Sequence, residues 1–291
     1  MVSVKSTLAT VGLVALLAGC GGRNAPTPPR VQPEDKLPSW SPDGQSIAYV
    51  HFNPDVGDNV EPSGLYVIDA AGSTKRLVIR GFPRNPDWSP DGRLIAFNDD
   101  AGLHVIGALG EGLHTINPGG SYPSWSPDGT EIAFSANSRI WTIRPDGTGL
   151  RAVTPPGVAS VDPDWSPDGR RMVFLGNRGG TFGEDVFILH VDSMSEERLT
   201  IDNNEDRSPA WSPCGDAIVW NPWLRSTGGR VRFELWVMDT IGTSRRHLVD
   251  AEAAPAWDPS GSRIAFSDQA STGIRLFVIN IDGTGLRQLT N

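Results

Sequence analysis

The sequence has little of the residues on which disulfide-rich domains, zinc proteins and nucleic-acid-binding proteins depend. It contains only two cysteines in 291 residues, Cys20 and Cys214, so a disulfide framework cannot organise the fold. Its five histidines form neither an H-x-x-H nor an H-E-x-x-H set, which disfavours a zinc site. The formal net charge of −9 disfavours nucleic-acid binding, because that function needs a basic patch or stripe.

Common catalytic signatures are missing as well. The sequence has no Gly-x-Ser-x-Gly elbow and no phosphate-binding P-loop. Acidic groups at Asp99-Asp100 and between Asp202 and Asp206 could supply oxygen ligands to Ca²⁺, but none has the EF-hand spacing. Turn formation is the simpler interpretation of these residues. We therefore predict a protein that is not an enzyme and needs no cofactor, with Ca²⁺ left as an open possibility.

Long hydrophobic runs are also absent. The apolar stretch from Leu8 to Ala18 is too short to span a bilayer comfortably, which favours a secretory signal over a transmembrane helix. The stretch leads into Leu17-Ala18-Gly19-Cys20, which resembles the lipobox of bacterial lipoproteins. That resemblance implies that Cys20 carries the lipid and begins the mature chain. The alternative is an ordinary secreted protein with an incidental cysteine.

A lipidated Cys20 divides the front of the chain into two parts. Residues 1–19 would be the signal peptide, and residues 20–37, rich in Pro, Arg, Asn and Gln, would be a flexible tether. Two or more acyl chains anchor a protein stably. We expect the protein in the bacterial cell envelope. It would lie on the periplasmic side of the outer membrane in a cell with two membranes, and otherwise on the outer face of the cytoplasmic membrane.

What the sequence does contain is one unit that recurs six times. Each copy has a Trp with Pro two residues before and two after it, and most continue into a turn such as Ser41-Pro42-Asp43-Gly44. The tryptophans are Trp40, Trp88, Trp125, Trp165, Trp211 and Trp257. Their spacings of 48, 37, 40, 46 and 46 residues match a four-stranded propeller blade, roughly 40–50 residues long. The many Pro and Gly residues argue against a solenoid of helix pairs.

Each unit contains four predicted strands. The first carries the Trp, the second follows the turn, and two further apolar runs complete the unit, as at Ile95–Phe97, Leu103–Ile106 and His114–Ile116 in the second copy. The middle strands are nearly continuous apolar runs, which indicates cover on both faces. We predict that the six tryptophans fill the space between blades and that each indole N–H reaches a backbone carbonyl. A ligand-stacking ladder is the alternative.

The repeated core Pro-x-Trp-Ser-Pro-Asp-Gly-x-x-Ile-Ala-Phe resembles the repeat of the TolB-type propeller family, also described as PD40 or WD40-like, over about residues 38 to 290. Cys214 replaces the turn Asp in the fifth copy, and residues 257–261 form the loosest copy. Cys214 would be a lone thiol and a neutral substitution. The resemblance implies an all-β, six-bladed propeller of four-stranded antiparallel blades over residues 38–291. We expect blades at about 38–80, 81–118, 119–156, 157–202, 203–250 and 251–291.

Propeller topology sorts the connections onto two faces. The turn face carries the six Ser-Pro-Asp-Gly-like turns and the tight links between third and fourth strands. The loop face carries the connections between second and third strands and those between blades. The long connections, at residues 51–64, 176–185 and 221–234, all fall on the loop face. Inter-blade segments add residues such as Asn85, Tyr122 and Asp162. Recognition normally resides in such loops.

The long loops supply the candidate partner-binding residues. The loop of blade five combines an aromatic with guanidinium groups, a composition typical of interface hot spots, and the loop of blade one is acidic. A surface with basic and acidic lobes suits a protein or peptide of mixed charge; solvated loops without a partner are the alternative. The candidates are Phe52, Asp55, Asp58, Arg178, Phe182, Trp223, Arg225, Arg230 and Arg232.

Two functions are compatible with this pattern. The first is a non-catalytic, lipid-anchored envelope protein, expected to be a monomer, which binds a protein or peptide partner and no nucleic acid. The second is a carbohydrate-active or sugar-binding propeller with a metal in its channel, because related repeats resemble those of pectin-degrading lyases. That version needs histidines and carboxylates clustered on the channel, and the scattered histidines argue against it. For the closure of the ring, we expect blade one to pack on blade six, with residues 31–37 as a possible aid. Removal of residues 21–37 should leave the melting temperature nearly unchanged.

Overall fold

The computed structural model describes residues 31–55, 60–179, 183–202, 204–225 and 231–291. Cys20, Asp58, Phe182 and Arg230 therefore lie outside the described residues. All regular elements in these ranges are strands. The described part of the chain has no helix that could cross a membrane. From Gln32 to Asn291 the chain forms one compact unit.

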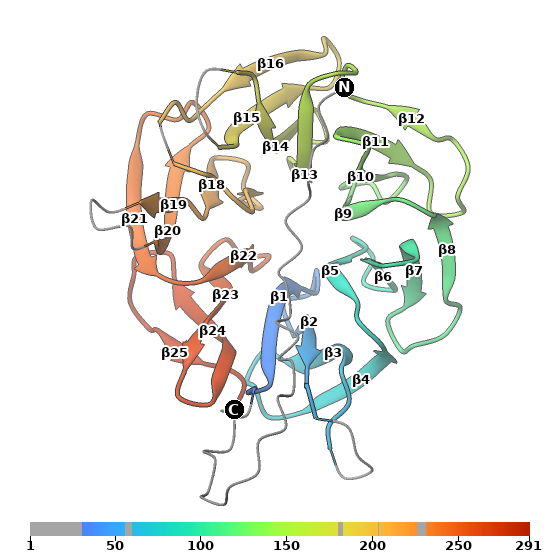
Figure 1. The fold of residues 1–291 in the computed structure, drawn as a ribbon, viewed down its shortest axis with the longest axis vertical. Helices are drawn as coiled ribbons and strands as arrows, with labels where there is room; N and C mark the ends of the chain where they lie inside the picture. The colour runs from blue at the N-terminus through green and yellow to red at the C-terminus, as the bar shows by residue number, and fades with distance from the viewer. Residues whose placement is uncertain (1–30, 56–59, 180–182, 203, 226–230) are drawn as a thin grey trace, which may run out of the picture. The chain divides into compact units, whose positions relative to one another are not determined.

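This unit is a six-bladed propeller, which confirms the predicted fold class (Figure 1). Its strands follow one another as antiparallel meanders around a central axis. Blade one contains β1 (Glu34–Trp40), β2 (Ser46–Phe52), β3 (Gly64–Asp69) and β4 (Lys75–Arg80). Blade two contains β5 (Arg84–Trp88), β6 (Leu94–Asp99), β7 (Gly102–Gly107) and β8 (His114–Asn117). Blade three contains β9 (Ser121–Trp125), β10 (Ile132–Ala136), β11 (Arg139–Ile143) and β12 (Arg151–Ala152).

The second half of the ring repeats this order with one addition. Blade four contains β13 (Ala159–Trp165), β14 (Arg171–Asn177), β15 (Asp185–His190) and β16 (Ser195–Arg198). Blade five contains β17 (Ala210–Trp211), β18 (Ala217–Trp220), β19 (Trp223–Arg225), β20 (Val231–Asp239) and β21 (Arg245–Asp250). Blade six contains β22 (Ala253–Trp257), β23 (Arg263–Ala270), β24 (Gly273–Asn280) and β25 (Arg287–Gln288). The addition is β19, which pairs with β20, so part of the long loop of blade five is β-structure.

Six hydrophobic clusters hold the blades together, and each joins two consecutive blades. The cluster between blades six and one, for example, contains Tyr49 and Leu276, both fully buried. One motif tryptophan contributes to every cluster, as Trp40 does here. The prediction that these tryptophans are inter-blade filler is therefore confirmed, and the middle strands are buried as expected for strands covered on both faces.

The hydrogen bonding of the tryptophans differs from the prediction. Only Trp257 donates its indole N–H to a backbone carbonyl, that of Ala210 at 3.2 Å. The other five indole nitrogens are buried and have no hydrogen-bond partner among the described residues. The polar link between blades runs through the main chain instead, because the backbone N–H groups of Trp125 and Trp211 donate to side chains of other blades, Asp87 and Asp164, at 2.8 Å.

The repeated turn has a common internal bond. The serine that follows the Trp donates its hydroxyl to the turn Asp, as Ser41 does to Asp43 at 2.6 Å. In blade five, where Cys214 replaces that Asp, Ser212 donates to Asp216 instead, at 2.8 Å. The replacement at Cys214 is therefore compensated two residues later along the chain.

The start of the propeller is earlier than the sequence indicated. β1 begins at Glu34, so residues assigned to the tether belong to the first strand. Asp35 is buried and lies 2.6 Å from Nδ1 of His51 on β2. Arg275 of β24 is also buried, with its Nε 4.0 Å from the same carboxylate. Blade one thus packs on blade six as predicted, and residues 34–37 are part of that contact, which argues against the expected tolerance to removal of residues 21–37.

Candidate functional site

The residue three positions before each motif Trp has a left-handed backbone, although none of the six is glycine. Their φ angles lie between 46° and 57°. The residues are Leu37, Asn85, Tyr122, Asp162, Ser208 and Ala254. In five of the blades the pairing of the first strand with the second shifts register at this point. These five first strands therefore carry a bulge, and bulges re-aim side chains.

Neighbouring blades hold several of these bulges in place. The N–H of Asp162 donates to Ser135 Oγ at 2.9 Å, and the N–H of Tyr122 donates to Asn98 Oδ1 at 3.3 Å. The N–H of Leu37 donates to Ser267 Oγ at 3.3 Å. Each acceptor is the fourth residue of an Ile-Ala-Phe-x second strand of the preceding blade. The left-handed conformation costs about 1 kcal/mol or more for a residue other than glycine, and the cross-blade bonds offset that cost.

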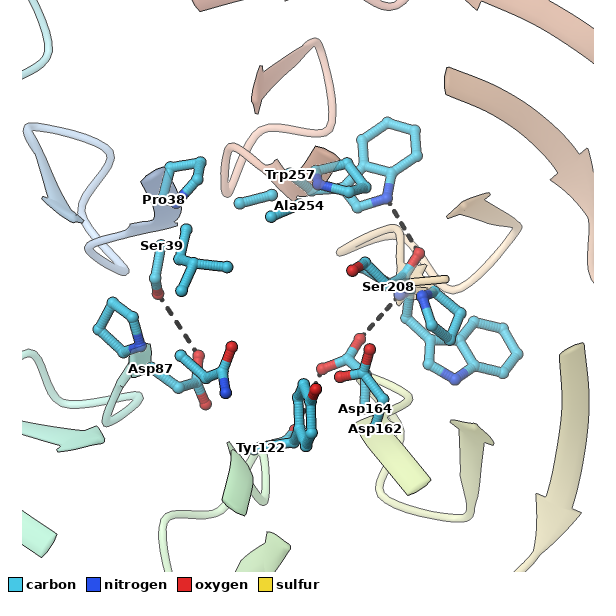
Figure 2. A pocket seen from close by; sticks show the side chains of 18 of the residues that line it. Pro38, Ser39, Asp87, Tyr122, Asp162, Asp164, Ser208, Ala254 and Trp257 are labelled. Atoms are coloured by element: carbon cyan, nitrogen blue, oxygen red, sulfur yellow. Dashed lines mark hydrogen bonds between the residues drawn. The ribbon is translucent and has the colours of Figure 1, made fainter. Parts of the chain in front are cut away.

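The six left-handed residues surround a pocket on the propeller axis with a volume of about 280 Å³ (Figure 2). It is lined in every blade by the left-handed residue, the Pro that follows it and the residue just before the Trp. Leu37 and Ala254 of its lining also border a cavity beside Trp223, which belongs to a connection on the loop face. We call the pocket on the axis the axial pocket.

The axial pocket has two unlike halves. Blades two, three and four line it with acidic and polar side chains: Asn85, Asp87, Tyr122, Ser124, Asp162 and Asp164. Blades five, six and one line it mainly with small or apolar side chains: Ser208, Ala210, Ala254, Ala256, Leu37 and Ser39. Figure 2 shows Asp87, Tyr122, Asp162 and Asp164 along one side and Pro38, Ala254 and Trp257 along the other. Among the described residues that line the pocket, none is Lys, Arg or His.

No cationic side chain in the described lining therefore offsets the negative charge of Asp87, Asp162 and Asp164. Burial raises the pKa of Asp87 and of Asp162 to about 7, and that of Asp164 to about 6. Repulsion from Asp164 adds to the effect of burial on the pKa of both other groups. Asp87 and Asp164 each accept a backbone N–H bond and a serine hydroxyl bond. A cationic group entering the pocket would meet carboxylates in a site of low polarity, where charge interactions are strong.

A second cavity of about 230 Å³ adjoins the axial pocket and shares Leu37 and Ala254 with it. Its walls include the predicted residue Trp223, with Phe233 and Ile274. The rings of Trp223 and Phe233 meet edge to face at 5.1 Å. The guanidinium carbon of Arg207 lies 3.6 Å from the centre of the Trp223 ring. We call this cavity the side groove.

The other predicted binding residues lie elsewhere on the loop face. Arg232 is exposed and pairs with Asp250 at 3.1 Å and with Glu234 at 3.4 Å. Arg225 pairs through its backbone with Val231, and its side chain lies outside the described part. The structure thus places Trp223, but not Arg232, against the cavity beside the axis.

The blade-one and blade-four candidates form separate groups. The ring centres of Phe52 and the exposed Phe82 lie 6.3 Å apart. Asp55 and Phe82 line a third cavity. Arg178 makes a two-pronged ion pair with Glu196 at 2.8 Å and stacks on Phe187. Its donors are used within blade four, which is typical of a structural clamp.

Sequence reasoning singled out Asn85, Tyr122 and Asp162 as loop-face residues but missed Asp87 and Asp164. The residue just before the constant Trp differs from blade to blade, and this variation could have identified Asp87 and Asp164. That position reads Ser39, Asp87, Ser124, Asp164, Ala210 and Ala256.

One group of three possible metal ligands occurs in the described ranges: Glu234, His247 and Asp250. Arg232 pairs with both carboxylates, and the indole of Trp236 donates to Glu234 at 2.9 Å. These contacts neutralise the group, so it fits an ion-pair network better than a metal site. Oδ1 of Asp99, considered above for Ca²⁺, lies 2.7 Å from Nε2 of His104 and accepts the backbone N–H of Ala101 at the same distance.

Comparison with known proteins agrees with this architecture. A protein of Agrobacterium tumefaciens described as a TolB is 23% identical, with a TM-score of 0.66 over 84% of this chain and 89% of the other. TolB of Acinetobacter baumannii is 18% identical, with a TM-score of 0.66 over 87% of this chain and 62% of the other. An oligogalacturonate lyase in complex with manganese is 13% identical, with a TM-score of 0.60 over 91% and 80%.

At these identities the solved structures show a common fold. The sequence itself matches the TolB beta propeller domain, PD40, over residues 111–291, which is more than half of its length. The chain therefore belongs to the TolB β-propeller family.

Proposed function

We propose that this protein is a non-catalytic envelope lipoprotein, anchored through Cys20, whose propeller binds a protein or peptide partner over the axial pocket. The observation that carries the proposal is the pairing of the acidic, cation-free half of the pocket with an apolar half. Such a site suits a cationic side chain or a terminal amine presented on an apolar segment. The fold neighbours described as TolB support an envelope location.

The side groove extends this surface. Trp223 offers an aromatic face that is half-buried and pre-positioned by Phe233 and Arg207, and aromatic anchors of this kind dominate binding energy at interfaces. A partner segment would lie across the groove and place its cationic group among Asp87, Asp162 and Asp164. Phe52 and Asp55 could meet a more distant part of a large partner, whereas a short peptide would not need them.

Cross-linking in intact cells, followed by identification of the cross-linked protein, tests this function. Trp223→Ala, alone and with Arg225→Ala, and the pair Asp162→Asn with Asp164→Asn should each reduce recovery of the partner at least about tenfold, a loss of about 1.4 kcal/mol. Arg93→Ala, at an exposed residue of the turn face, is the matched control and should leave recovery unchanged. Full recovery with both loop-face variants would overturn the proposed site.

A sugar-binding or carbohydrate-active propeller with a channel metal is the second candidate, because an oligogalacturonate lyase with manganese shares the fold. The three carboxylates of the axial pocket would be its available oxygen ligands. Calorimetric titration with Mn²⁺ and Ca²⁺ separates the two functions: binding that is lost in Asp162→Asn with Asp164→Asn would favour this candidate. No heat and no change in melting temperature would favour the scaffold.

A further inference from the structure

The side groove lies where three blades meet. Its walls include Leu37 of blade one, Trp223 and Phe233 of blade five, and Glu252 at the start of blade six. The backbone N–H of Leu37 donates to Oγ of Ser267, another wall residue from blade six, at 3.3 Å. The rings of Trp223 and Phe233 meet edge to face. Contacts within and between blades thus fix the walls before a ligand arrives, which lowers the ordering cost of binding.

The indole N–H of Trp223 has no acceptor in the described part of the chain, although the residue is half-buried. Of the ten tryptophans, four lie outside the six motif positions. The other three of these four, Trp141, Trp220 and Trp236, donate to nearby oxygens at 2.9–3.1 Å. The guanidinium of Arg207 covers one face of the Trp223 ring. A ligand in the groove can therefore meet the other face and the edge of this indole, where it would supply the missing acceptor.

The charged part of the groove is acidic. Lys36, the basic residue of the lining, pairs with Glu34 at 2.7 Å, whereas Glu252 makes no ion pair with a described residue. Burial raises the pKa of Glu252; the charge of Lys36 lowers it, and the charges of Asp268 and Glu34 raise it. A half-buried carboxylate in these surroundings favours a basic group on the ligand.

The backbone of a peptide ligand would find few acceptors in the groove. Among the side chains of the described lining, only Glu252 and Ser267 carry an oxygen, and Ser267 already accepts the N–H of Leu37. A buried peptide N–H without an acceptor costs free energy, but proline has no N–H. The carbonyls of a polyproline II helix remain free to accept hydrogen bonds. Segments with this conformation dock in grooves lined by aromatic side chains.

We propose that the side groove binds a proline-rich segment of the partner in the polyproline II conformation, with a basic residue beside the prolines. The proline rings pack on Trp223 and Phe233, a carbonyl of the segment accepts the indole N–H of Trp223, and the basic residue pairs with Glu252. This inference rests on the proposed function, because the side groove adjoins the axial pocket. It adds the chemistry of the segment that the groove takes.

An array of synthetic peptides tests the inference. One half presents short peptides of the form x-Pro-Pro-x-Pro-x-Arg, with x varied, and the matched half has Ala in place of every Pro. The purified full-length protein is applied to the array, and calorimetry then gives the Kd of the strongest binders. The proline peptides should bind at least about tenfold more tightly than their alanine counterparts. Equal binding of the two halves would overturn the inference, and tighter binding of the alanine peptides would overturn it in favour of a helical segment.

Variants of the protein locate the binding site. Trp223→Phe keeps an aromatic ring but removes the donor, and should weaken binding of the best proline peptide about fivefold, the effect of one hydrogen bond. Trp223→Ala should weaken it at least about tenfold. Glu252→Gln should weaken it about threefold, and only for peptides that keep the Arg. Arg93→Ala, on the turn face, is the control and should change nothing. Binding that survives Trp223→Ala would overturn the site.

The cross-linking experiment described above separates this inference from the proposed function. No binding by any peptide of the array, together with cross-linking in cells that depends on Trp223, would overturn the proline-rich segment and leave the proposed function standing. No binding by any peptide, together with full recovery of the partner by the loop-face variants, would overturn both.

Discussion

Gly44 in the first blade packs against Pro259 in the sixth: a Cβ atom on Gly44 would lie 3.4 Å from the Pro259 ring. The same contact, between a turn glycine and the turn proline of the preceding blade, recurs around the ring at 3.2–3.5 Å. The other pairs are Gly92 with Pro42, Gly129 with Pro90, Gly169 with Pro127, Gly215 with Pro167, and Gly261 with Pro213. The junction between blades six and one, which closes the ring, therefore has the same contact as the other five junctions.

Substitution of Gly44 by Ala should lower the free energy of unfolding by about 1 kcal/mol or more, because its φ of +68° disfavours a side chain. Urea denaturation of the soluble propeller measures the effect. Gly119→Ala is the control: Gly119 is exposed, its φ is not in the left-handed region, and an added Cβ atom would meet only ordinary contact. Equal stability of the two variants would contradict the strain that the left-handed backbone of Gly44 imposes on a side chain.

Truncation from the N-terminus should show a sharp threshold. A protein that begins at Val31 should melt like the longer chain, whereas one that begins at Pro38 should lose about 3 kcal/mol or more. The second truncation removes Asp35, which leaves His51 and Arg275 buried without their carboxylate partner. Differential scanning calorimetry of both proteins provides the test, and equal melting temperatures would show that the seam does not need β1 before Pro38.

In blade five, Asp216 should matter more than Cys214. Asp216→Ala removes the acceptor of the Ser212 hydroxyl and should cost about 1 kcal/mol of unfolding free energy, the typical value of one hydrogen bond. Cys214→Ala should stay within about 0.5 kcal/mol, since the exposed thiol holds no turn bond. Chemical denaturation of the two variants compares them directly, and a larger loss for Cys214→Ala would refute the compensation.

The carboxyl group of Asp162 should make stability depend on pH. Its pKa of about 7 in the folded protein lies above the ordinary value of 3.8, so the folded state binds the proton more tightly. This contribution is complete below about pH 4 and is lost as the pH rises through about 7. Asp162→Asn should therefore be more stable than the wild type at pH 8, by at least about 1 kcal/mol, and the gain should shrink toward pH 4.

Asp43→Asn provides a control of opposite sign for the same titration. The hydroxyl of Ser41 and the N–H of Gln45 hold the pKa of Asp43 below its usual value, so its contribution is present above that value and is lost as the pH falls. Urea denaturation curves at several pH values measure both variants. A gain for Asp162→Asn that does not change with pH would mean that the carboxyl group is not the cause.

The repeat allowed the fold to be predicted in detail because Trp, Pro, Asp and Gly each have a strong local preference that recurs in six blades. The start of β1 was missed, since residues 34–37 lack the apolar pattern of the other strands and are ordered by Asp35 meeting His51 and Arg275 across the seam. β19 was missed for a related reason: its pairing with β20 depends on the edge-to-face contact of Trp223 with Phe233.

The axial pocket was only partly predictable. The sequence identified Asn85, Tyr122 and Asp162 as loop-face residues, but a spacing along the chain does not reveal that six left-handed residues gather around one axis. The raised pKa of Asp87 likewise depends on burial and on the charge of Asp164, which lies two blades away along the chain. Proximity across blades, rather than local preference, creates the chemistry of this site.

The six left-handed residues also show where the side chain of the repeat can vary while the backbone shape stays the same. At three of them, Leu37, Tyr122 and Asp162, a side chain of the preceding blade accepts the backbone N–H. Leu, Asn, Tyr, Asp, Ser and Ala already occupy the six equivalent places. Because such different side chains share one backbone shape, a substitution there would alter the lining of the channel more than the scaffold, which gives a lineage several positions at which to acquire a new ligand.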